Sequence, residues 1–94
     1  MCGIAGRYNF SSGAPVQGEL LKMMCDLLAH RGPDGEGIYQ KANLGFGHRR
    51  LAVIDLTEAA QQPMVRENGR FVITYNGEIY NFQELRRNLE ALGH

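Results

Sequence analysis

The second residue of the chain is a cysteine, in the opening stretch MCGIAG. Aminopeptidases that remove the initiator methionine need a small second residue, so the mature chain is expected to start at Cys2 with a free α-amine. Such an amine titrates near ~7.7 to 8.0, against ~10.4 for lysine, so part of it is neutral near pH 7 and can act as a base. Cys2 would then supply both a nucleophile and its base. The alternative is that Cys2 is a small apolar residue in an edge strand.

The pair Asn76-Gly77, within YNGEIYN, offers a second kind of chemistry. A side-chain amide and a backbone N–H lie close together in such a pair, and two donors of this kind suit an oxyanion. Asn-Gly is also the sequence that a two-residue hairpin turn demands. The two interpretations are compatible, because a turn can aim the donors.

Arg50 lies in GHRRLAVID, between two apolar stretches, and could form a bidentate pair with a substrate carboxylate. The alternative is a solvated arginine pair. His48, two residues earlier, either orients Arg50 or pairs within a sheet. The glycines of HRGPDGEG allow a ligand to approach the backbone closely, but their spacing matches neither a P-loop nor a GxGxxG motif, so phosphate binding is not predicted.

Composition argues against several classes of function. The chain of 94 residues carries ten basic and ten acidic side chains, so no net charge attracts nucleic acid or a membrane surface. No apolar run is long enough to span a bilayer, and neither secretion nor membrane insertion is expected. Cys2 and Cys25 match no metal-ligand spacing and no disulfide framework, so no metal site is predicted and a cytoplasmic compartment is favoured. Cys25, on a predicted helix, is interpreted as a packing residue.

The hydrophobic pattern predicts short strands around two helices. The predicted elements are a strand at 3–8, a helix at 16–30, strands at 38–40, 44–48 and 51–56, a polar connection at 57–69, a strand at 70–75, a return strand at 78–81 and a helix within 81–93. Pro15 suits a first helical position, and Pro33 prevents the first helix from continuing. Asn81 with Glu84 predicts a capping box, and Gly93 predicts the turn that ends the last helix.

Five stretches in this order carry a resemblance: CGIAG, RGPDGEG, GHRRLAVIDL, QQPM and YNGEIYNFQELR. Together they resemble the amino-terminal glutaminase domain of glutamine-dependent asparagine synthetases, within the class II glutamine amidotransferases. RGPDG and YNGEIYNF look like this branch rather than the glucosamine-phosphate or purine-pathway branches. The resemblance implies an α+β fold, an Ntn-hydrolase-like four-layer αββα sandwich. Residues 1–94 would be the N-terminal part, about the first half, of a type 2 glutamine amidotransferase domain.

The resemblance also implies a catalytic centre. Cys2 would attack the side-chain amide carbon of glutamine, with its own amine as the base, and a Cys2 thioester would be hydrolysed to glutamate after ammonia leaves. The Asn76 side chain and the Gly77 backbone N–H match the family's oxyanion donors, and losing one such donor costs on the order of 10²-fold or more in rate. If Met1 stays in place, Cys2 has no free amine and this mechanism fails.

Substrate-binding residues follow from the same resemblance. Arg50 matches the arginine that binds the glutamine α-carboxylate, and Leu51 and Val53 match positions that line the amino-acid pocket. Glu78 matches a residue beside the substrate, as do Asn76 and Gly77. The family places a further acidic residue, for the substrate α-ammonium, beyond the second helix, and this chain stops at His94 before that motif.

The implied partners are glutamine and a C-terminal synthetase domain that would use the ammonia to make asparagine from aspartate and ATP. No cofactor is expected in this domain, and ATP and Mg only in the synthetase domain. Neither nucleic acid nor a membrane is an expected partner. The isolated chain is expected to expose an apolar surface and therefore to show weak solubility, self-association as a homo-oligomer, or an incomplete and inactive site. The alternatives are the glutaminase module of another amidotransferase, for instance one acting on a cell-surface sugar, and a catalytically incomplete binding fragment.

Overall fold

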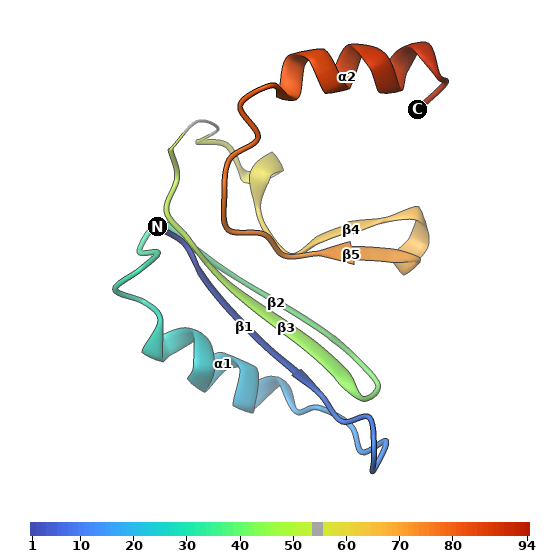
Figure 1. The fold of residues 1–94 in the computed structure, drawn as a ribbon. Helices are drawn as coiled ribbons and strands as arrows, with labels where there is room; N and C mark the ends of the chain where they lie inside the picture. The colour runs from blue at the N-terminus through green and yellow to red at the C-terminus, as the bar shows by residue number, and fades with distance from the viewer. Residues whose placement is uncertain (54–55) are drawn as a thin grey trace.

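The computed structural model describes residues 1–53 and 56–94. Its elements are β1 (Gly3–Tyr8), α1 (Gly18–Leu27), β2 (Gly35–Lys41), β3 (Leu44–Arg50), β4 (Met64–Arg66), β5 (Phe71–Ile73) and α2 (Phe82–Ala91), with 3₁₀ turns at Glu58–Ala60 and Glu67–Gly69. Figure 1 shows α1 on one side of the sheet formed by β1, β2 and β3, and the β4–β5 pair on the other side. The predicted α+β class, with antiparallel pairing, is confirmed.

The first sheet has the strand order β1-β3-β2, and α1 packs on one of its faces. On this face β3 presents Gly45 and Gly47 rather than bulky side chains. A Cβ on Gly47 would lie 2.4 Å from the Sγ of Cys25, so the helix sits directly against the strand. Leu21 and Cys25 are fully buried there, next to Val16. Cys25 is therefore a packing residue, as predicted.

The second sheet consists of β4 and β5 alone, paired antiparallel. Residues 67–70 connect them, and Glu67, Asn68 and Gly69 have φ of 51°, 56° and 88°, in the left-handed region that Asn and Gly tolerate best. A Cβ on Gly37 of β2 would lie 1.8 Å from the carbonyl oxygen of Gln62. The segment that leads into β4 thus lies in backbone contact with the first sheet.

The sequence predicts only a polar connection at 57–69, and this prediction is wrong because β4 lies within that range. The error follows from the short length of the strand, which offers only three residues of alternation. Asn68-Gly69 lies in the loop of the β4–β5 hairpin, whereas the sequence predicts the hairpin turn at the other Asn-Gly pair, Asn76-Gly77.

The predicted hairpin turn at Asn76-Gly77, with a return strand at 78–81, is wrong. β5 ends at Ile73, and residues 74–81 form neither helix nor strand. Tyr75 explains the difference, because its N–H donates to the side chain of Gln62 and its carbonyl accepts from His48. Backbone groups bonded in this way are not available to a return strand.

The predicted strand at 51–56 is also wrong over its described residues, 51–53 and 56, which form no strand. The backbone N–H groups of this stretch have side-chain acceptors. The N–H of Leu51 donates to the Sγ of Cys2, and that of Ala52 donates to the Oδ2 of Asp34. Apolar, β-branched composition cannot produce a strand where the backbone donors are already taken. Residues 54 and 55 lie outside the described residues.

The first helix is shorter than the predicted 16–30. The N–H of Val16 donates to the carbonyl of Ala42 in the β2–β3 turn, so the helix begins two residues later and Pro15 lies before it. At the other end, the N–H groups of Leu28 and Arg31 bond three residues back, which is the pattern of tight turns. β1 has its predicted bounds, whereas β2 and β3 extend beyond theirs because they pair along their full length.

α2 confirms the predicted last helix, with one correction at its start. Asn81 makes no capping hydrogen bond with its side chain, so the predicted capping box is absent. At the other end Gly93 has a φ of 90°. Its N–H donates to the carbonyl of Glu90, and the N–H of His94 donates to that of Leu89, which is the Schellman pattern.

α2 buries none of its residues. Phe82, Leu85 and Leu89, on its apolar face, are 40%, 41% and 51% exposed, so the chain does expose an apolar surface, as predicted. Figure 1 shows α2 beyond the β4–β5 pair. The structure shows two helices with antiparallel sheets, and the four-layer sandwich is not established by it. Within the described residues, neither helix combines the length and apolarity needed to cross a bilayer.

Candidate active site

Cys2 lies just before β1, where the antiparallel register of β1 and β3 places it opposite Arg50. The backbone of Leu51 contacts its sulfur twice. The N–H of Leu51 donates to Sγ at 3.2 Å, and the thiol donates to the carbonyl of Leu51 at 3.7 Å. The Nε of Arg31 donates to the carbonyl of Cys2 at 3.2 Å. The sulfur of Cys2 therefore has a backbone donor and a backbone acceptor within reach, and both hold it just before β1.

The HRGPDGEG loop fastens the ends of β1 and β3 to each other. Besides the bond from Arg31, the N–H of Asp34 donates to the carbonyl of Arg50 at 2.9 Å, and its Oδ2 accepts from the N–H of Ala52 at 2.9 Å. Arg49 donates from Nε to the carbonyl of Gly32 at 3.1 Å. The loop therefore bonds to the backbone that carries Cys2 and Arg50.

Arg50 is the last residue of β3 and is only 7% exposed. Its Nη1 donates to the carbonyl of Thr57 at 2.7 Å. A guanidinium anchored by a backbone carbonyl keeps a fixed orientation, which suits bidentate recognition of a carboxylate.

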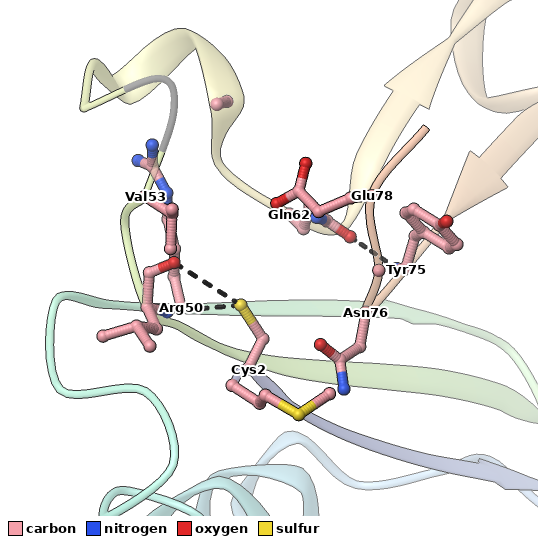
Figure 2. Close-up of a pocket in the computed structure, with 11 residues that line it drawn as sticks. Cys2, Arg50, Val53, Gln62, Tyr75, Asn76 and Glu78 are labelled. Atoms are coloured by element: carbon pink, nitrogen blue, oxygen red, sulfur yellow. Dashed lines mark hydrogen bonds between the residues drawn. The ribbon is translucent and has the colours of Figure 1, made fainter. Parts of the chain in front are cut away.

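Asn76 and Gly77 lie across the cavity from the end of β3. Figure 2 shows the sulfur of Cys2 between Arg50 on one side and the side chain of Asn76 on the other. A Cβ on Gly77 would lie 2.6 Å from the hydroxyl of Tyr75, so the aromatic ring folds back closely over this segment.

The structure brings all the predicted site residues together around one cavity of about 270 Å³. These residues are Cys2, Arg50, Leu51, Val53, Asn76, Gly77 and Glu78. The volume is close to the lower end of the ~300–1,000 Å³ found for small-molecule sites, which fits a ligand of amino-acid size. Residues that are far apart in the sequence therefore form one concave surface that carries a thiol, a guanidinium and amide groups.

Four further residues line the cavity, and sequence reasoning did not assign them to it: Met1, Ala60, Gln62 and Tyr75. Gln62 belongs to the QQPM stretch, and Tyr75 immediately precedes the Asn-Gly pair. The Oε1 of Gln62 accepts a hydrogen bond from the N–H of Tyr75 (Figure 2). Nothing local in the sequence predicts this contact.

His48 lies in β3 and pairs within the sheet, opposite Ile4 of β1 and Gly37 of β2, which is one of its two predicted roles. Its Nε2 lies 3.3 Å from the carbonyl oxygen of Tyr75. Because a carbonyl can only accept, Nε2 carries the proton. The side chain is 1% exposed, and burial lowers the pKa of His48, with the charge of Arg50 acting in the same direction. The ring is therefore neutral near pH 7.

The two cysteines differ in their chemistry. Both are free thiols, but Cys2 is partly exposed while Cys25 is buried. Burial raises the pKa of Cys25, which keeps this residue a neutral thiol at physiological pH. Within residues 1–53 and 56–94, no group of three His, Cys, Asp or Glu side chains is arranged to hold a metal ion.

The model of the glutamine amidotransferase domain family matches residues 1–94, and the chain belongs to this family. The chain is 45% identical over 96 residues to glutamine-hydrolysing asparagine synthetase 1 of Bacillus subtilis, a match that covers 100% of the chain and 15% of the relative. Identity to asparagine synthetase 3 of the same organism is 40% over 96 residues, covering 100% of the chain and 16% of that protein.

A plant relative gives the same picture. Identity to glutamine-hydrolysing asparagine synthetase 1 of Arabidopsis thaliana is 40% over 90 residues, covering 96% of the chain and 15% of the relative. The chain thus spans about 15% of the length of the curated relatives named here. No solved structure matches the chain significantly.

Proposed function

We propose that this chain is the glutamine-hydrolysing part of an amidotransferase, and that it releases ammonia and glutamate from glutamine. The observation that carries the proposal is the meeting of Cys2, Arg50 and the Asn76-Gly77 pair on one cavity. A nucleophile, a carboxylate-binding cation and paired amide donors are the three things that hydrolysis of a glutamine side-chain amide requires.

The nucleophile depends on processing of the chain. With Met1 in place, the nitrogen of Cys2 is an amide and cannot act as a base. Removal of Met1, which is 74% exposed and lines the cavity, frees the α-amine next to the thiol and enlarges the space for substrate. The N–H of Leu51, already 3.2 Å from Sγ, then stabilises the thiolate as the amine takes its proton.

Substrate orientation follows from the two ends of glutamine. The guanidinium of Arg50 pairs with the α-carboxylate, while Leu51 and Val53 contact the aliphatic part of the side chain. The amide carbon then reaches Cys2, with its oxygen directed at the Asn76 side chain and the Gly77 N–H. A fixed charge at one end of a flexible ligand places the reacting group at the other end.

The reaction proceeds in two halves. The sulfur of Cys2 forms a bond to the amide carbon, and the π electrons of the carbonyl move to its oxygen, which the Asn76 and Gly77 donors stabilise. The α-ammonium returns its proton to the leaving nitrogen, the carbon–nitrogen bond breaks and ammonia departs, leaving a thioester on Cys2. Water then attacks the thioester with the amine as base, and glutamate leaves as the thiol re-forms.

For the whole protein, we propose that the ammonia is consumed in a C-terminal synthetase domain that converts aspartate to asparagine with ATP and Mg. The names of the relatives support this, and they favour it over other amidotransferases. The proposal includes a cytoplasmic compartment, because the nucleophile must remain a free thiol. It also includes the four-layer Ntn-type fold, supported by helices on the outer sides of the two sheets (Figure 1).

The first test is covalent labelling with a diazo-ketone analogue of glutamine, followed by intact mass and peptide mapping. A chain that has lost Met1 is expected to gain one adduct on Cys2, and excess glutamine should prevent it. Cys25→Ala is the matched control, since it removes the buried thiol and should label at the rate of the unmodified protein. Cys2→Ala should not label.

Two results would overturn the proposal. One is labelling of Cys25 as fast as Cys2, which would mean that no pocket selects the amino-terminal thiol. The other is a full-length protein that has lost Met1 yet neither labels on Cys2 nor releases glutamate from glutamine. The acceptor is tested separately with glutamine labelled with ¹⁵N in its side-chain amide, in the presence of aspartate, ATP and Mg. Transfer of the label to asparagine is expected, and its absence with glutamate still formed would point to another acceptor.

A further inference from the structure

The backbone of Tyr75 is held on both of its polar groups by side chains from elsewhere in the chain. Its N–H donates to the Oε1 of Gln62, thirteen residues earlier, and its carbonyl accepts from the Nε2 of His48, twenty-seven residues earlier. Gln62 lies in the segment before β4, and His48 lies in β3, so one bond comes from the first sheet and the other from the segment that leads into the second. Figure 2 shows the bond to Gln62 at the cavity wall.

We call His48 and Gln62 together the clamp, and it holds a segment that has no hydrogen bonds of a sheet to stabilise it. Residues 74–81 belong to no helix or strand. Irregular backbone of this kind opens easily unless specific bonds hold it. His48 is 1% exposed, so the donor in its bond to the Tyr75 carbonyl is sheltered from competing water.

The Tyr75 carbonyl lies in the same rigid peptide plane as the N–H and Cα of Asn76. Fixing that carbonyl therefore fixes the position of the Asn76 Cα and narrows the directions in which its side chain can project, and the Gly77 N–H follows one residue later. Donors contribute to catalysis only when they point at the place where negative charge develops. The geometry of the donors thus depends on two side chains that do not themselves touch the reacting atoms.

We infer that His48 and Gln62 are positioning residues that hold the Tyr75 peptide and so aim the Asn76 and Gly77 donors at the oxyanion formed on Cys2. The inference rests on the proposed function. It assigns a role to the QQPM stretch and to His48, neither of which has a role in the reaction steps above.

The test uses substitutions that remove one bond each in the full-length protein. Gln62→Met keeps the length of the side chain and removes the acceptor, while Gln62→Glu restores an acceptor oxygen. His48→Leu removes the donor, and His48→Gln keeps an N–H in a similar place. Gln61→Met is the matched control, because Gln61 is the neighbouring glutamine and does not line the cavity. Gln62 lies outside the strands and is half-buried, whereas His48 is 1% exposed, so the Gln62 variants keep the test valid if His48→Leu fails to fold.

We expect Gln62→Met to lower kcat by about 10-fold, less than the 10²-fold or more expected when a donor is lost outright, with little change in KM. Site-resolved amide hydrogen exchange should become faster at Asn76 and Gly77, not only at Tyr75, and remain unchanged in β1. Gln62→Glu and His48→Gln should recover part of both effects, and Gln61→Met should behave as the unmodified protein.

Three results would overturn the inference. Unchanged exchange at Asn76 and Gly77 in both Gln62→Met and His48→Leu would show that the clamp holds nothing. Faster exchange with unchanged kcat would show that the clamp does not position the donors. A rise in KM with unchanged kcat would place both residues in substrate binding instead. If the unmodified protein hydrolyses no glutamine, the proposed function fails, and the catalytic role of the clamp fails with it, while the exchange comparison still reports whether the clamp holds the segment.

Discussion

Gly37→Ala is the substitution that tests most directly how the two sheets form the site. Gly37 lies in β2, and a Cβ there would meet the carbonyl oxygen of Gln62 at 1.8 Å and the Cδ of Pro63 at 3.2 Å. The first of these neighbours is backbone, which cannot swing aside as the end of a flexible side chain can. Accommodating one methyl group therefore requires the segment before β4 to move away from the first sheet.

The size of the effect follows from these distances. Real Cβ contacts essentially never fall below 3.0 Å, so the Gln62 carbonyl must retreat by about 1 Å. Overpacking of this kind costs about 1–3 kcal/mol of stability. Because Gln62 also holds the Tyr75 N–H, the displacement reaches the Asn76-Gly77 donors. A misplacement of about 1 Å at a reacting group can cost on the order of 10²-fold in rate.

The assay combines urea unfolding with glutaminase kinetics on the full-length protein. Gly6→Ala is the matched control, because Gly6 is in the same sheet and a Cβ there meets nothing closer than 3.4 Å. It should be neutral or stabilise by about 0.4–1 kcal/mol, with unchanged kcat. Gly37→Ala should lower kcat by more than the decrease in the folded fraction of the protein accounts for. If Gly37→Ala keeps full activity while folded, the contact between β2 and the segment before β4 does not shape the site.

Three further predictions concern substrate binding, pH and packing. Arg50→Lys should raise KM for glutamine about 10-fold or more, because a lysine cannot make the bidentate pair, and an unchanged KM would remove Arg50 from carboxylate recognition. The free energy of unfolding should fall as the pH drops below about 6.5, because His48 takes up a proton in the unfolded chain more readily than in the folded chain. It should also fall as the pH rises above about 8.5, because Cys25 loses its proton in the unfolded chain more readily than in the folded chain. Urea unfolding midpoints measured across pH check both effects. His48→Gln should remove the loss of stability at low pH, and Cys25→Ala should remove the loss at high pH. Gly47→Ala should cost about 1–3 kcal/mol in the same assay, since its Cβ would lie 2.4 Å from the sulfur of Cys25.

Local sequence predicted the elements whose signals are local. β1 and α2 follow from an apolar run and a helical period, and Gly93 ends α2 as glycine does at many helix ends. Failures occurred where backbone groups bond to distant side chains. The stretch at 51–53 reads as a strand, but its N–H groups donate to Cys2 and Asp34. Asn-Gly occurs twice in the sequence, and only the pair at 68–69 makes a hairpin turn.

The amino-acid sequence was enough to show which chemical groups are available, namely a thiol at the second position, an arginine and an Asn-Gly pair, and the family resemblance added the roles expected of them. These are properties of residue types and of short motifs, and they are readable without a fold. The fold was needed to show that these groups share one cavity, and that the side chains of Gln62 and His48 bond to the backbone of Tyr75, next to the amide pair. The physical reason is that such bonds join residues far apart in the chain, and their formation depends on how the two sheets pack rather than on any periodicity along the sequence.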